Sequence, residues 1–200
     1  LWASFFVSSC SKKNKIIGSS FNPCEGFSFE CKEGKQIVII YSSSGQIVLE
    51  LYPNYAPLTV ANFLDLVSKG IYNNTTFHRV IKDPYPFIIQ GGDPNSKKRK
   101  LKDIKLGLGG FVDPKNGKSR LIPLEIKLKK EEKPRYNRLV KNPNEINEIN
   151  LKHERGTLSM ARSEPLNSAS SQFYIALKRL PVLDGRYAVF GRIIKGMDVL

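Results

Sequence analysis

The stretch FHRVIKDPYPFIIQGGDP, Phe77 to Pro94, decides how this chain folds, because it contains two apolar runs separated by the proline-containing link KDPYP. The runs 77–81 and 87–90 have the aromatic and β-branched composition of strands. Arg79 and Gln90 lie within them, although a strand that buries apolar residues normally leaves charge on its solvent face. Two polar side chains so close to a predicted core raise the question of a functional site.

Sequences on both sides of this stretch predict further strands and one helix. QIVIIY (36–41) and QIVLELY (46–52) flank the turn SSSG and predict a β-hairpin. Pro57 suits the first turn of a helix and Gly70 its end, with apolar residues at helical spacing between them. Strand composition returns downstream in three segments: GTLSMAR (156–162), SQFYIAL (171–177) and LDGRYAVFGRII (183–194).

The order of these elements indicates a mainly β fold. Antiparallel strands, turns at short intervals and one clear helix are typical of a closed barrel or a sandwich with helices at its ends. The last residues, GMDVL (196–200), have the pattern with which another apolar helix would begin. We therefore expect the C-terminus to be truncated.

Positive charge is concentrated in one segment. The 200 residues are 40% hydrophobic and 25% charged, which is typical of one soluble domain, and the net charge is +14. Residues 97–155 contain 18 Lys and Arg against 8 Asp and Glu, so they carry +10 of that charge. Residues 95–154 show little periodicity, and we expect a long basic insertion, mostly loop, with short strands near residues 121–126.

The charge of the basic segment has three possible interpretations. A solvated loop is the first interpretation, and contact with an anionic membrane surface is the alternative. We expect no nucleic-acid partner, because neither interleaved aromatic residues nor a recognition module accompanies the charge.

The N-terminal segment has the features of a processed leader. LWASFFV (1–7) is far shorter than the roughly 20 residues of a spanning helix. Small residues precede Cys10 in VSSC, which resembles a bacterial lipoprotein signal whose cysteine becomes lipidated. We expect residues 1–10 to be a signal remnant, residues 11–35 a tether, and the protein to be exported and lipid-anchored in a bacterial cell envelope. The alternatives are a frayed apolar terminus and a cytoplasmic location.

The cysteines and histidines leave two interpretations open. In an oxidising compartment Cys24 and Cys31 could pair, but two free thiols are the alternative, because a sequence does not show distances. We expect neither a metal nor another cofactor, since two cysteines and the distant His78 and His153 lack zinc-ligand spacing.

Groups for covalent or acid–base catalysis are missing from the sequence patterns. Neither His78 nor His153 adjoins a Ser or Cys in a nucleophile motif. GLGGF (107–111) lacks the Lys-Ser/Thr ending of a phosphate-binding loop, and no paired carboxylates are visible. One arginine, two glutamines and a set of apolar residues remain.

Five motifs, in order, resemble the cyclophilins, a family of peptidyl-prolyl cis-trans isomerases. They are GQIVLELYPNYAPLTVANFLDLVSKGIY, FHRVI with PFIIQGGDP, GTLSMAR, NSASSQFYIAL and LDGRYAVFGRIIKGMDVL. The resemblance covers residues 36–200 with the basic insertion at about 95–154, and KHERGTLSMARS and DGRYAVFG are similar to bacterial, particularly cyanobacterial, members. It implies a closed antiparallel β-barrel with flanking helices.

The isomerase activity that the resemblance implies requires no nucleophile, in agreement with the sequence patterns. Rotation about an X-Pro bond faces a barrier of roughly 20 kcal/mol from amide resonance, and no bond is made or broken. A ~10⁵-fold acceleration requires about 7 kcal/mol of preferential binding to the twisted amide. A fixed guanidinium can donate to the prolyl nitrogen, whose lone pair becomes available as resonance is lost, while an apolar cup holds the ring.

The resemblance assigns roles to residues of this chain. Arg79 matches the catalytic arginine, with Phe87 and Gln90 in the catalytic group. Tyr187 stands where animal members have histidine and bacterial ones commonly tyrosine. The remaining assignments are a proline pocket formed by Phe87, Ile88, Tyr174 and Leu183, and contacts to the substrate backbone from Gln90, Gln172 and the main chain of Ala161 and Arg162.

Several departures from the family pattern affect these expectations. Ile88 replaces a common Met of similar volume, so the pocket is expected to survive. Arg162 replaces a frequent Asn and either favours acidic substrates or points into solvent. Val182 replaces a Trp that donates a hydrogen bond to cyclosporin, so we expect weak cyclosporin binding. The link KDPYP is longer than its family counterpart and puts the spacing of Arg79 and Phe87 in question.

Two functions from different classes follow. The first is a monomeric isomerase that acts on proline-containing peptides and assists protein folding. The second is a non-catalytic proline-peptide binding module or envelope interaction protein. The retained Arg79 favours the first.

Overall fold

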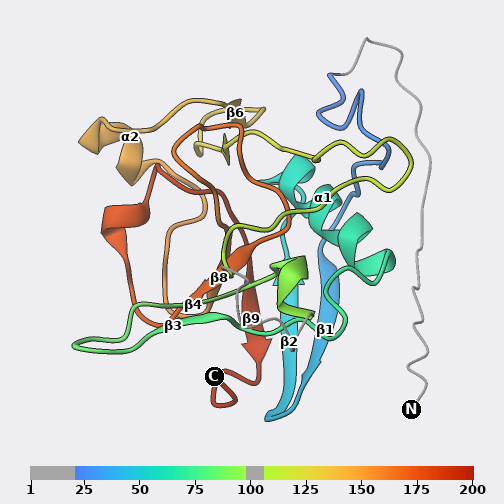
Figure 1. The fold of residues 1–200 in the computed structure, drawn as a ribbon. Coiled ribbons are helices and arrows are strands. Elements are labelled where there is room, and N and C mark those ends of the chain that lie inside the picture. Colours follow the sequence, from blue (N-terminus) through green and yellow to red (C-terminus); the bar gives the residue numbers. More distant parts are fainter. Residues whose placement is uncertain (1–20, 98–105) are drawn as a thin grey trace.

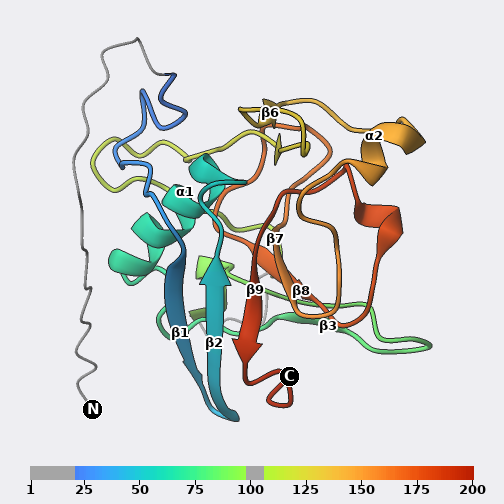
Figure 2. The ribbon, with the colours of Figure 1, turned by 180° about the vertical axis from the view of Figure 1, so that it is seen from behind.

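One curled antiparallel sheet forms the centre of the molecule (Figures 1 and 2). The computed structural model describes residues 21–97 and 106–200. The sheet has seven strands, and neighbours in it are joined by antiparallel pairing. In spatial order these are β1 (Gln36–Ser42), β2 (Gly45–Leu51), β9 (Val189–Lys195), β7 (Thr157–Met160), β8 (Phe173–Ala176), β4 (Ile88–Gly91) and β3 (Arg79–Ile81).

Short helices and a second, small sheet complete the fold. The predicted helix is α1 (Pro57–Ser68), and Gly70 follows it with φ 65°, a value that favours glycine. The other elements are the 3-10 helices Pro94–Lys97 and Pro181–Leu183, the pair β5 (Glu125–Ile126) and β6 (Arg135–Tyr136), and α2 (Pro143–Asn147). In the described parts of the chain, no helix has both the length and the apolar composition that crossing a membrane requires.

The sheet is a half-barrel rather than the closed barrel expected from the sequence. Strands β1 and β3 are its two ends, and no pairing between them is found in residues 21–97 and 106–200. β3 has only three residues, two of them exposed, so it offers little ladder to a further strand. Closure of the barrel is therefore not confirmed.

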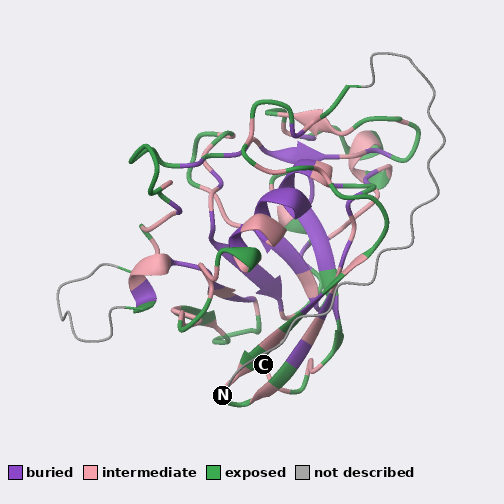
Figure 3. Cartoon of the chain, turned by 90° about the vertical axis from the view of Figure 1, so that its right-hand side faces the viewer, coloured by how far each residue is buried: buried purple, intermediate pink, exposed green. Residues whose placement is uncertain are grey.

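The main core lies between α1 and the concave side of the sheet. Phe63 of α1 is 1% exposed, and its ring centre is 5.0 Å from that of Tyr72, 5.5 Å from Phe173 and 5.2 Å from Phe190. Figure 3 shows that buried residues gather in the central strands and in α1. Aromatic rings in such tilted and edge-on contacts stabilise the packing of helix on sheet.

The basic insertion contains a second core. Its residues 106–154 include β5, β6 and α2, and an apolar cluster that also contains Ala188. The expected long basic loop is not confirmed for these residues, because apolar side chains scattered among polar residues turn inward. Those of the insertion are Leu124, Ile126, Leu128, Val140 and Ile149. The short strand expected near residues 121–126 is present as β5.

A buried carboxylate connects the two cores. Glu125 is 1% exposed and accepts hydrogen bonds from the main-chain N–H of Leu58 (3.1 Å) and Thr59 (2.8 Å) at the start of α1. The Thr59 hydroxyl (2.6 Å) and the Tyr136 hydroxyl (2.7 Å) also donate to it. Burial raises the pKa of Glu125 above its ordinary value, and these hydrogen bonds oppose the rise. Glu125 thus caps a helix that has no side-chain cap of its own.

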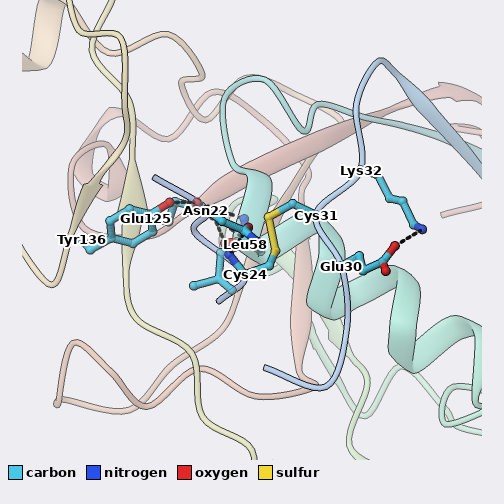
Figure 4. The surroundings of a disulfide bond; sticks show 9 residues. Asn22, Cys24, Glu30, Cys31, Lys32, Leu58, Glu125 and Tyr136 are labelled. Atoms are coloured by element: carbon cyan, nitrogen blue, oxygen red, sulfur yellow. Dashed lines mark hydrogen bonds and ion pairs between the residues drawn. A yellow bond between two sulfur atoms is a disulfide. The ribbon is translucent and has the colours of Figure 1, made fainter. Parts of the chain in front are cut away.

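Within residues 21–35, part of the segment predicted to be a tether, Cys24 is buried in the main core. Cys24 and Cys31 form a disulfide, with Cα atoms 5.5 Å apart, so the first of the two cysteine alternatives holds (Figure 4). Phe27 and Phe29 pack against the main core. The Arg120 guanidinium lies 5.0 Å from the Phe29 ring centre, which ties this segment to the insertion. The predictions for residues 1–10, including Cys10, lie outside the described residues.

Candidate active site

Strand pairing brings Arg79 and Gln90 together. Arg79 of β3 is directly opposite Gln90 of β4, and its Nη1 donates to Gln90 Oε1 at 3.5 Å. Gln90 Nε2 in turn donates to Gln172 Oε1 at 2.9 Å, and Gln172 Nε2 donates to the Gly109 carbonyl at 2.6 Å. We call Arg79, Gln90 and Gln172 the polar line. It links the tip of an exposed arginine to two oriented amides.

The far end of the polar line is held by a buried aspartate. Asp93 is fully buried, and its Oδ2 accepts from the main-chain N–H of Gly107 (2.6 Å) and Gly109 (3.2 Å). A Cβ on Gly109 would collide with Asp93, so glycine is needed where this turn approaches the carboxylate. The carbonyl that orients Gln172 is therefore itself fixed.

An apolar cluster adjoins the polar line, and we call it the apolar site cluster. Its buried members include Ile88 (5% exposed) and Tyr174 (3% exposed). The structure thus brings together all apolar residues assigned to the site from the sequence. The partly exposed members that pack on the buried ones include Phe87, Ala161, Leu183 and Tyr187.

The link KDPYP leaves the register of these strands intact. Arg79, Val80 and Ile81 pair in order with Gln90, Ile89 and Ile88, and the Phe87 N–H donates to the Ile81 carbonyl at 2.9 Å. The extra residues loop outward, where the Tyr85 side chain is 70% exposed. The longer link therefore does not separate Arg79 from the apolar site cluster.

A buried histidine network supports the cluster from behind. His153 Nδ1 is 2.8 Å from Asp184 Oδ1, and His153 Nε2 is 2.8 Å from the Tyr174 hydroxyl. Since an ionised carboxylate only accepts, His153 Nδ1–H donates to Asp184, and Nε2 faces the Tyr174 hydroxyl. Burial raises the pKa of Tyr174, so its hydroxyl keeps the proton that it donates.

Ser159, His153 and Asp184 resemble a nucleophilic triad in their distances alone. Ser159 Oγ lies 3.1 Å from His153 Nε2, but Ser159 is fully buried, His153 is 1% exposed and Asp184 is 5% exposed. No substrate carbonyl can reach this hydroxyl, so the group supports the site and does not react. Sequence reasoning missed it, because His153 and Asp184 are 31 positions apart.

Arg162, for which the sequence left contact with acidic substrates or with solvent open, is partly exposed. Its guanidinium turns back onto main-chain carbonyls and lies 4.9 Å from the ring centre of Tyr187. A cavity of about 310 Å³ opens beside it. The cavity is lined by the polar line residues Gln90 and Gln172, by Ala161 and Arg162, and by glycines, serines and two leucines from residues 107–110, 119–121 and 163–170. Within residues 21–97 and 106–200 no three His, Cys, Asp or Glu side chains are grouped to hold a metal ion.

Known proteins resemble this chain over most of its length. Residues 37–200 match the family described as cyclophilin type peptidyl-prolyl cis-trans isomerase/CLD. The isomerase cypE of Dictyostelium discoideum is 38% identical over 83% of this chain and 83% of its own length. The isomerase CYP18-2 of Arabidopsis thaliana is 35% identical over 82% of this chain and 77% of its own.

Solved structures agree with this similarity. A cyclophilin type isomerase of Cryptosporidium parvum, crystallised in the presence of the dipeptide Ala-Pro, has a TM-score of 0.58 and 35% identity. The match covers 82% of this chain and 82% of that one. The two relatives above are eukaryotic, so the bacterial affinity expected from the sequence is not confirmed. With the family model, the relatives and the solved structure in agreement, the chain belongs to the cyclophilin-type peptidyl-prolyl cis-trans isomerases.

Proposed function

We propose that Arg79 and the apolar site cluster carry the isomerase activity, accelerating rotation about X-Pro bonds in protein substrates and so assisting folding. One observation carries this assignment. An exposed guanidinium is held by Gln90 at the edge of a cluster whose accessible members are Phe87, Leu183 and Tyr187. This combines a fixed donor with a surface that matches a proline ring.

The mechanism follows from the electronic structure of the amide. As the X-Pro bond twists, resonance is lost and the prolyl nitrogen gains a lone pair that can accept a hydrogen bond. Arg79 has five N–H groups, and the bond to Gln90 uses one of them, so others can reach that nitrogen. Because the planar amide offers no such acceptor, the interaction favours the transition state over the ground state.

The remaining residues hold the peptide during rotation. The proline ring rests on Phe87 and Leu183, above the buried floor of Ile88 and Tyr174. The Ala161 N–H already donates to the Gln172 carbonyl at 2.9 Å. Contact with the substrate main chain therefore falls to the carbonyl of Ala161 and to the amides of the polar line.

A protease-coupled assay on a proline tetrapeptide tests this function. The parent protein is expected to accelerate cis-to-trans conversion in proportion to its concentration. Tight binding of the peptide without acceleration would instead support the non-catalytic binding module.

Weak cyclosporin binding is expected, and a single substitution tests the reason. Val182 is 61% exposed on the helix beside Leu183 and has no hydrogen-bond donor in its side chain. Val182→Trp supplies an indole N–H and a large apolar face, and is expected to tighten cyclosporin binding about 10-fold or more in calorimetry. Val182→Phe is the control, because it adds area without the donor. Nanomolar binding by the parent would contradict the prediction.

An exported location is supported by the Cys24–Cys31 disulfide, because disulfides persist in oxidising compartments. Lipidation of Cys10 in a bacterial envelope, contact of the basic insertion with anionic lipid, and a monomeric state belong to the same proposal.

The intact mass of the protein isolated from its own cells, with and without reduction and alkylation, tests the disulfide and the lipidation. We expect two alkyl groups on Cys24 and Cys31 only after reduction, and added acyl mass on Cys10. Free thiols at positions 24 and 31 in freshly quenched cells would contradict export.

A further inference from the structure

We propose that Arg162 is a positioning residue that holds Tyr187 in the apolar site cluster, and that it does not select acidic substrates. The inference rests on the proposed function of that cluster. From the sequence, Arg162 could favour acidic substrates or point into solvent. In the structure its guanidinium binds main-chain carbonyls and lies against Tyr187.

The guanidinium of Arg162 is fixed by main-chain carbonyls from two segments of the chain. Nε and Nη2 both donate to the Arg186 carbonyl, at 3.0 and 2.9 Å. Nη1 donates to the carbonyls of Ser163 (2.8 Å) and Glu164 (3.0 Å). Four of the five N–H groups are therefore used by the protein itself. An arginine bound in this way has little capacity left for a carboxylate of the substrate.

The plane so fixed supports a tyrosine ring. The guanidinium carbon of Arg162 lies 4.9 Å from the centre of the Tyr187 ring. Tyr187 in turn meets Tyr174 edge-on, with ring centres 5.7 Å apart and an interplanar angle of 86°. The Tyr174 hydroxyl is hydrogen-bonded to His153. Tyr187 therefore lies between the fixed guanidinium of Arg162 and the fixed ring of Tyr174.

The same contact anchors the loop that carries two site residues. Residues 183–187 include Leu183 and Tyr187. The loop is fixed at Asp184 by His153, and at the Gly185 carbonyl by the Val140 N–H at 3.0 Å. Arg162 supplies the anchor at position 186, adjacent to Tyr187. Loss of the guanidinium therefore removes the partner of the Arg186 carbonyl, while the Arg186 N–H and the Ala188 carbonyl keep their main-chain bonds.

Arg162→Ala is expected to lower kcat/KM about 3- to 10-fold, mainly through a higher KM. The value of kcat should change less than about twofold, because Arg79 and the polar line are untouched. Arg162→Lys should resemble Arg162→Ala, because an ammonium cannot form the fork to the Arg186 carbonyl. Arg186→Ala is the matched control: it removes an exposed guanidinium next to Tyr187 and keeps the carbonyl that Arg162 binds.

A double-mutant cycle with Tyr187→Ala decides between positioning and direct recognition. If Arg162 acts through Tyr187, Arg162→Ala should have almost no further effect in the Tyr187→Ala background. Each variant is assayed on a neutral peptide and on one with Asp before the proline, and its melting temperature is recorded. Equal losses on both peptides are expected. Independent effects in the cycle, a loss confined to the acidic peptide, or full rescue by Lys would overturn the proposal.

The peptide dissociation constants of the same variants are measured by calorimetry. These show the Arg162–Tyr187 coupling even if the parent binds peptide without isomerising it. Failure of the proposed function is thereby distinguished from failure of this inference. A wild-type dissociation constant in Arg162→Ala would overturn the inference alone.

Discussion

Replacing Arg79 with alanine is expected to lower kcat/KM for a proline tetrapeptide by about 10²- to 10³-fold, the loss typical of one preorganised transition-state donor. The guanidinium is exposed and its one hydrogen bond in the described residues, to Gln90, is long at 3.5 Å. Its removal should therefore leave the melting temperature almost unchanged. Coupled kinetics at several enzyme concentrations, with thermal unfolding of the same samples, provide the measurement.

Two control variants define what Arg79 contributes. Arg79→Lys keeps the charge and loses the planar fork, so it should recover only a small part of the activity. Arg192→Ala removes an exposed arginine from β9 and should leave kcat/KM near that of the parent. Parent-like activity of Arg79→Ala would show that the prolyl nitrogen is not the atom being stabilised here.

Glu125→Ala is expected to destabilise the fold by about 3 to 5 kcal/mol, because it leaves three buried donors and the part-buried Tyr136 hydroxyl without their acceptor. Two of these donors are main-chain N–H groups of the first turn of α1, the helix that carries Phe63 into the main core. Urea unfolding at pH 7 gives the free energy. Glu132→Ala, at an exposed position, is the matched control and should change it by less than about 0.5 kcal/mol.

The raised pKa of Glu125 gives its contribution a pH dependence of known sign. As pH rises above the ordinary glutamate range, the unfolded chain loses its proton before the folded one does. The contribution of Glu125 is therefore full below that range and falls as pH rises through its raised pKa. The free energy of unfolding of the parent relative to Glu125→Gln should decrease over this window. A difference that stays constant or increases with pH would contradict the raised pKa.

Local patterns were enough to predict the main elements of the fold. Alternation and a turn located the β1–β2 hairpin, and proline and glycine bounded α1 within two residues. Strands β7 and β8 lie inside the segments predicted for them, and β9 extends one residue beyond its segment, to Lys195. These features depend on residues that are close in sequence, which is why periodicity shows them.

Features that depend on distant contacts could not be predicted in this way. Glu125 caps α1 from 67 residues away, and the apolar side chains of the basic insertion form one cluster with Ala188, which comes from a distant part of the chain. The edge strand β3 has only three residues, and amino-acid composition does not predict the length of a strand. The sequence could suggest that Arg162 contacts acidic substrates or solvent, but the main-chain carbonyls that bind it are visible only in the structure.

The candidate site residues came from the resemblance, and strand register brings them together in space. Arg79, Gln90 and Gln172 form one hydrogen-bonded line, and Ile88 and Tyr174 lie in one cluster. Their grouping is a geometric result, whereas their roles in catalysis stay predictions. The supporting network around His153 required the structure.

Exchange NMR on one proline peptide tests the central claim most directly, because it gives the cis–trans exchange rate and the dissociation constant in the same sample. The parent should accelerate exchange at catalytic concentration. Arg79→Ala should bind the peptide within about threefold of the parent, since the apolar site cluster is intact, while exchange falls by about 10²-fold or more. Equal acceleration by both proteins, or binding by the parent without acceleration, would contradict the account.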